Sequence, residues 1–180
     1  MTQAPPVKHE QTPMRRILKS VSMGWLAVAL LAPPAALAQT VHATLTSHHE
    51  VPALSTPGAG SFRAKLDLAA GTIAWELQYA DLEADALQSH IHFGQAGVNG
   101  GISAFLCTNL GNGPAGTLTC PMRSGTLSGV ITAASVIGPS GQGITPGEFA
   151  ALAAAILDGT AYVNVHTTAW PAGEIRGQIR

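Results

Sequence analysis

Residues 161–167 read AYVNVHT and residues 170–179 read WPAGEIRGQI, and in both stretches apolar and polar side chains alternate. Because successive side chains of a β-strand point to opposite faces, this period of two predicts two strands. Pro171 and Gly173 favour a turn between them, since Pro presets φ and Gly tolerates positive φ. The C-terminus is therefore predicted to be a β-hairpin with one aliphatic face. Its other face carries Asn, His, Glu, Arg and Gln side chains, which either bond one another or bind a ligand.

Alternation of the same kind recurs upstream of this hairpin. It predicts strands at residues 41–46, 61–68, 72–79, 90–93, 102–107 and 125–131, separated by Gly-, Asn- and Pro-rich turns. One helix is predicted between Thr145 and Asp158, where Thr145 and Glu148 form a capping box and Pro146 takes the first helical position. Short alternating strands with such turns predict an all-β fold, an antiparallel sandwich or flattened barrel of the immunoglobulin or superoxide dismutase kind, with one inserted α-helix.

The N-terminal region has the three parts of a secretory signal peptide. Basic residues precede the apolar run 21–31, and Ala36-Leu37-Ala38 forms a small-x-small cleavage site before Gln39. The run is shorter than the roughly 20 residues that a membrane-spanning helix needs. We therefore expect a signal peptide over residues 1–38, a mature domain over 39–180 that is secreted or periplasmic, and no membrane span after processing. Translation can start at Met1 or Met14.

The charge of the mature chain argues against some classes of binding partner. Four of the nine Lys and Arg residues and one of the ten Asp and Glu residues lie in the leader, which leaves a formal charge of −4. An acidic domain without a Lys/Arg cluster is a poor candidate for binding nucleic acid or an anionic membrane. A protein, a glycan or a small ligand is the expected partner.

Two cysteines remain in the mature chain, Cys107 and Cys120. In an exported protein a pair this close is expected to form a disulfide. The loop between them consists largely of turn residues, and closing it is worth about 3 kcal/mol in the chain-entropy model.

Three histidines are candidate metal ligands. His90 and His92 point to the same side of one predicted strand, and His166 lies on the polar face of the C-terminal hairpin. Three imidazoles form a compact site for zinc or copper. In the alternative interpretation the histidines bond neighbouring polar groups and hold loops in place. Under either interpretation we expect them to lie in one polar cluster with Asn164, Glu174, Arg176 and Glu50. No nucleophile with a paired base is evident, so no catalytic residue is assigned.

Several motifs together resemble the chordin-type (CHRD) domain. They are His49-Glu50-Val51-Pro52, Ser89-His90-Ile91-His92-Phe93-Gly94, Gly97-x-Asn99-Gly100, Tyr162-Val-Asn-Val-His-Thr167 and Pro171-x-Gly173-Glu-Ile-Arg-Gly-Gln178. The resemblance covers about Thr40 to Arg180, with Ala53 in place of a usual second Pro and Ser89 in place of a usual Ala. It implies a bacterial, single-domain, secreted member of a β-sandwich-like family that also occurs as repeats in an animal protein that binds growth factors. No reaction is implied.

Two functions are therefore expected. The first is an exported, non-enzymatic CHRD domain that acts as a binding module. The alternative is a copper- or zinc-binding redox protein that uses His90, His92 and His166, because His90-x-His92-Phe-Gly94 resembles the copper-binding strand of copper/zinc superoxide dismutases.

Overall fold

Alternating apolar residues bring the strands of this chain into one antiparallel sheet. The computed structural model describes residues 1–3 and 38–180, and the predicted signal peptide lies outside these residues except at its two ends. The described strands are β1 (Gln39–Thr46), β2 (Ala59–Asp67), β3 (Thr72–Ala80), β4 (Ala86–Phe93), β5 (Gly101–Thr108), β6 (Gly125–Ile131), β7 (Ala161–Thr167) and β8 (Ile175–Gln178). Single 3-10 turns lie at Ser47–His49, Ala133–Ser135 and Ser140–Gln142, and helix α1 spans Phe149–Leu157.

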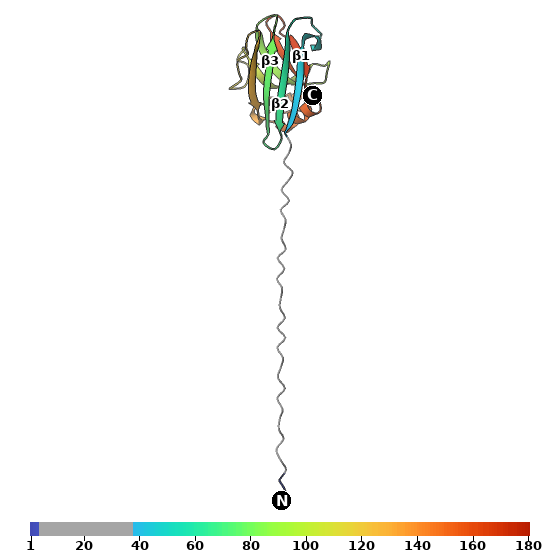
Figure 1. Ribbon diagram of the computed structural model, residues 1–180, viewed down its shortest axis with the longest axis vertical. Helices are drawn as coiled ribbons and strands as arrows, with labels where there is room; N and C mark the ends of the chain where they lie inside the picture. The colour runs from blue at the N-terminus through green and yellow to red at the C-terminus, as the bar shows by residue number, and fades with distance from the viewer. Residues whose placement is uncertain (4–37) are drawn as a thin grey trace. The chain divides into compact units, whose positions relative to one another are not determined.

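The sheet has the order β5-β4-β7-β8-β1-β2-β3-β6, and every pairing is antiparallel. Figure 1 shows β1, β2 and β3 side by side, as their registers require. The two outer strands, β5 and β6, approach each other: Leu106 of β5 and Ile131 of β6 line the same small cavity. The sheet therefore curls into a flattened, nearly closed barrel, and the predicted all-β fold is confirmed.

One face of this sheet encloses the hydrophobic core. Its fully buried side chains include Leu45, Phe62, Leu77, Ile91, Val163 and Val165, which come from β1, β2, β3, β4 and β7. Burying each such side chain contributes about 1.5–3 kcal/mol. The predicted inward-facing positions of β1 and β3 are all found in this core.

The C-terminal hairpin forms as predicted and lies inside the sheet rather than at its edge. β7 pairs with β4 and β8, and β8 pairs with β7 and β1. Every residue of β7 is buried, on both faces of the sheet. Polar side chains on its second face are therefore shielded from water and need partners within the protein.

The cysteine pair forms the predicted disulfide. Cys107 at the end of β5 and Cys120 are bonded, with their Cα atoms 5.1 Å apart and a sequence separation of 13. The bond fastens the loop after β5 to the sheet. Disulfides of this kind are typical of proteins in oxidising compartments.

Two details of the predicted elements are wrong. The helix starts at Phe149 instead of directly after Thr145, because Gly147 adopts a left-handed φ of 86° that no helical turn contains. Glu148 still accepts hydrogen bonds from the backbone and hydroxyl of Thr145, so the predicted contact forms outside the helix. Leu68, predicted to face the core from a strand, is 46% exposed, because β2 ends at Asp67 and Leu68 begins the turn.

Candidate functional site

Polar side chains cover the face of β4, β7 and β8 that points away from the hydrophobic core. Register places His90 of β4 opposite Asn164 of β7, and Asn164 opposite Arg176 of β8. These three side chains are at most 3% exposed. The loop of residues 94–100 and the segment around Glu50 contact the same face, so this part of the sheet has a second, polar interior.

Three histidines meet in this polar interior. One ring nitrogen from each of His90, His92 and His166 lies within 4.8 Å of the other two. The closest pair is His90 Nδ1 and His166 Nε2, at 3.2 Å. Two nitrogens that each bond one metal ion at about 2 Å lie at most about 4 Å apart, and this pair is already within that limit.

Backbone carbonyl groups fix the orientation of two of these rings. His92 Nδ1 is 2.9 Å from the carbonyl oxygen of Gly100, and His166 Nδ1 is 2.9 Å from that of Pro171. A carbonyl oxygen only accepts, so both Nδ1 atoms carry the proton and both Nε2 atoms carry a lone pair. His90 Nδ1 then donates to His166 Nε2, which leaves the lone pair of His90 on Nε2.

Burial keeps all three rings neutral. It lowers the pKa of His90 to about 2, helped by the nearby rings of His166 and His92. It lowers the pKa of His92 to about 4, against the opposing effect of the Gly100 carbonyl. Burial also lowers the pKa of His166. Neutral imidazoles hydrogen-bond each other and are the form in which histidine binds metal ions.

Arg176 joins the polar interior to the loop 94–100. Its guanidinium donates to the carbonyl groups of Gln95 (3.1 Å) and Val98 (2.8 Å) and to the Asn99 side chain (3.1 Å). Its central carbon lies 3.4 Å from the centre of the Tyr162 ring. The Tyr162 ring in turn stacks on His92, with ring centres 4.8 Å apart and planes 4° from parallel. Arginine, tyrosine and histidine therefore form one packed column, in which the arginine anchors the loop.

Glu50 reaches the same interior from the segment that follows β1. Its side chain is 6% exposed, and burial raises the pKa of its carboxyl group to about 7 although Arg176 and Asn164 oppose the shift. The Asn164 amide also raises the pKa of His92, so it lies between the carboxyl group and the histidines. Gly173, at φ 132°, passes directly over this contact. A side chain at Gly173 would run into the Glu50 carboxylate.

Glu174 does not lie with the histidines, contrary to the expected polar cluster. Its carboxylate accepts hydrogen bonds from the Thr167 hydroxyl (2.8 Å) and the Glu83 backbone (2.7 Å). Thr167 belongs to the aliphatic side of β7. The alternating pattern of the sequence includes Glu174, but β8 begins at Ile175, so the strand period does not fix the direction of the Glu174 side chain.

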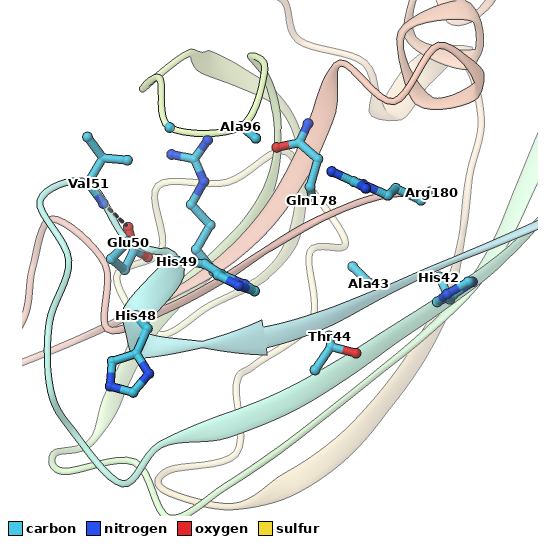
Figure 2. A pocket seen from close by; sticks show the side chains of 12 residues that line it. His42, Ala43, Thr44, His48, His49, Glu50, Val51, Ala96, Gln178 and Arg180 are labelled. Atoms are coloured by element: carbon cyan, nitrogen blue, oxygen red, sulfur yellow. Dashed lines mark hydrogen bonds between the residues drawn. The ribbon is translucent and has the colours of Figure 1, made fainter.

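A cavity of about 550 Å³ opens beside the polar interior (Figure 2). Its labelled side chains come from β1, the segment 48–51, Ala96 and the C-terminal residues Gln178 and Arg180. Arg176 and Glu50 connect it to the cluster described above. Exposed His42, His48, His49 and Arg180 line its outer part.

Sequence reasoning missed this cavity and part of the column. The contribution of Tyr162 was not foreseen, although it shares a strand face with Asn164 and His166. The roles of Gly100 and Pro171 depend on backbone carbonyl groups, which leave no signal in residue type. His42 and Gln178 also occupy outward positions of predicted strands, but only the pairing of β1 with β8 places them at one cavity.

The fold and this site define an all-β domain with an enclosed polar cluster on the outer face of its sheet. A family model described as CHRD domain matches residues 41–179. The chain therefore belongs to the CHRD domain family, as its motifs predicted. No curated protein and no solved structure matches it. Among the described residues, no helix is long and apolar enough to cross a membrane.

Proposed function

We propose that this protein is an exported, non-enzymatic binding module and that its ligand is an anionic glycan held in the cavity between β1, β8 and the segment 48–51. The observation that carries the proposal is the cavity itself. Its volume of about 550 Å³ falls within the range of small-ligand sites. Segments far apart in the sequence converge on it, and β1 and β8 give it a rigid floor.

The lining favours a ligand with anionic groups. The lining includes two arginines, Arg176 and Arg180, and the histidines His42, His48 and His49. Among the described residues, the only side-chain carboxyl group in the lining is that of Glu50. Because burial raises the pKa of Glu50 to about 7, this carboxyl group is partly protonated at neutral pH and repels an anion weakly. Thr44 and Gln178 add hydroxyl and amide groups that suit the hydroxyl groups of a sugar.

A further observation supports export. The disulfide fits an oxidising compartment, as does the leader expected at residues 1–38. Within residues 38–180, both cysteines are consumed by the disulfide, and no hydroxyl group bonds to a ring of the histidine cluster. In this part of the chain, the three histidines therefore do not form the hydroxyl–histidine or thiol–histidine pair of a nucleophilic enzyme.

The test is titration with a heparin-derived tetrasaccharide, followed by calorimetry and by backbone amide shifts. Maltotetraose serves as the uncharged comparison, and a hexaglutamate peptide tests for an acidic protein segment instead of a glycan. We expect only the sulfated sugar to bind, with shifts at residues 42–51 and 95–98. The exposed Ala96 lines the cavity, so Ala96→Trp should fill it and weaken binding by about tenfold or more.

Ala70→Trp is the matched control, because Ala70 is equally an exposed loop alanine but does not line the cavity. It should bind the tetrasaccharide as the unaltered protein does. Equal binding by both tryptophan variants would refute the cavity as the site. Binding of hexaglutamate alone would refute the glycan assignment.

A further inference from the structure

The histidine cluster contains buried nitrogen lone pairs that the rest of the protein does not use. Within residues 38–180, Nε2 of His90 and Nε2 of His92 are inaccessible to water and have no hydrogen-bond partner. An unpaired buried nitrogen destabilises the folded protein, because its hydrogen bond to water is lost without replacement. A purely structural cluster would pair the lone pair of His92 Nε2, which stays free to bind a metal ion because Nδ1 of that ring donates to Gly100.

The spacing of the rings fits a metal ion. Zn–N bonds of about 2.05 Å at tetrahedral angles separate two ligand nitrogens by about 3.3 Å. His90 Nδ1 and His166 Nε2 are 3.2 Å apart. One ring nitrogen from each of the three histidines lies within 4.8 Å of the other two, so the third nitrogen would move by about 1.5 Å at most to complete a three-nitrogen face. Side-chain rotation alone can supply such a shift.

The surroundings already have the features of a metal site. Metal-binding histidines usually donate their second ring N–H to a carbonyl or carboxylate group, which fixes the ring and its lone pair. His92 does so to Gly100 and His166 does so to Pro171. The amide oxygen of Asn164, which pairs with His90 across the strands, is also buried and without a partner among residues 38–180. A water molecule bound to the metal ion would be one source of the hydrogen bond that this oxygen lacks.

We propose that His90, His92 and His166 bind one transition-metal ion, with copper preferred over zinc. Imidazole suits both metals, and at a given nitrogen site copper(II) binds more tightly than zinc. His90 Nδ1 exchanges its hydrogen bond to His166 for a bond to the metal, and the proton of that ring moves to Nε2. His92 and His166 are 7% and 8% exposed, whereas His90 is fully buried, so these two rings lie nearest the surface. None of the three histidines lines the proposed glycan cavity, so a test of metal binding and a test of glycan binding have independent outcomes.

The experiment uses the mature protein purified without a histidine tag and stripped of metal with a chelator. It is incubated with copper sulfate, zinc sulfate or both, desalted, and analysed for metal by mass spectrometry. We expect about one copper ion per chain, displacement of zinc by copper, and an electron paramagnetic resonance spectrum with hyperfine splitting from imidazole nitrogens. Less than about a tenth of an equivalent of either metal would overturn the proposal.

Exposed histidines are the main source of false binding, so the control removes them. The triple variant His42→Asn, His48→Asn, His49→Asn leaves the cluster intact and should retain the full equivalent of copper. His92→Gln should lose it. Loss of copper from the triple variant, or its retention by folded His92→Gln, would contradict the site.

A measurement on the unaltered protein decides the question if His92→Gln does not fold. Substoichiometric copper(II) should broaden the ring resonances of His90, His92 and His166 before those of the exposed histidines. Broadening confined to His42, His48 and His49 would refute the assignment.

Discussion

Removal of the Arg176 side chain should weaken the attachment of the loop 94–100 to the sheet. The guanidinium makes three hydrogen bonds to that loop and a cation–π contact with Tyr162, and it is 1% exposed. A hydrogen bond to a charged group is worth about 1.5–3 kcal/mol, but the carbonyl groups of the loop regain water after truncation, so about 1 kcal/mol for each bond is appropriate. A buried cation–π contact adds about 1 kcal/mol. Arg176→Ala should therefore lower the free energy of unfolding by about 4 kcal/mol.

Urea denaturation followed by tryptophan fluorescence measures this loss, and hydrogen exchange locates it. Amide exchange should accelerate at residues 95–99 more than in β2 or β3. Arg63→Ala is the matched control, since Arg63 is exposed on β2, and it should change stability by less than about 0.5 kcal/mol. Arg176→Lys should fall between the two, because lysine keeps the charge but lacks the planar fork that reaches several acceptors.

If Arg176→Ala lowers the free energy of unfolding by less than about 1 kcal/mol, the prediction is refuted, because an average substitution has an effect of that size. An unchanged rate of amide hydrogen exchange at residues 95–99 would also refute it. Either result would mean that the loop is held by other contacts and that the column of Arg176, Tyr162 and His92 does not stabilise it.

Two further predictions concern the disulfide and Glu50. Replacing Cys107 and Cys120 together by alanine should lower the free energy of unfolding by about 3 kcal/mol through the entropy of the opened loop. Urea denaturation of the double variant and of the unaltered protein measures the difference. Reductant should destabilise only the unaltered protein, and an effect of reductant on the variant would contradict the assignment. For Glu50, the folded pKa of about 7 exceeds the ordinary value of 4.5, so the folded state holds the proton more tightly. Its contribution is fully present below pH 4.5 and is lost as the pH rises through 7, which amounts to about 3 kcal/mol. Glu50→Gln carries no such proton, so its stability relative to the unaltered protein should rise by that amount between pH 4.5 and pH 8. A difference that does not change with pH would show that Glu50 is not desolvated.

The C-terminal hairpin shows which features a local sequence pattern determines. Alternation placed Val163 and Val165 in the core and Asn164 and His166 on the opposite face, because a strand's two-residue period follows from backbone geometry alone. The same local rule identified the strands that pair in sequence order, such as β2 and β3. It failed at Glu174 and Leu68, which lie just beyond the ends of strands, where the period no longer applies. It also failed at Gly147, whose left-handed conformation delays the helix.

The family and the disulfide also followed from the sequence, since long motifs and a close cysteine pair in a chain with an expected leader are local features. That His90, His92 and His166 lie together was a prediction from face and residue type, but their spacing depended on the placement of β7 between β4 and β8. Only the tertiary structure decided that their face is enclosed by loops, that carbonyl groups orient the rings, and that β1 and β8 form a cavity with the segment 48–51. These properties arise from contacts between residues distant in sequence, whose geometry is set by packing of the whole sheet and not by any local pattern.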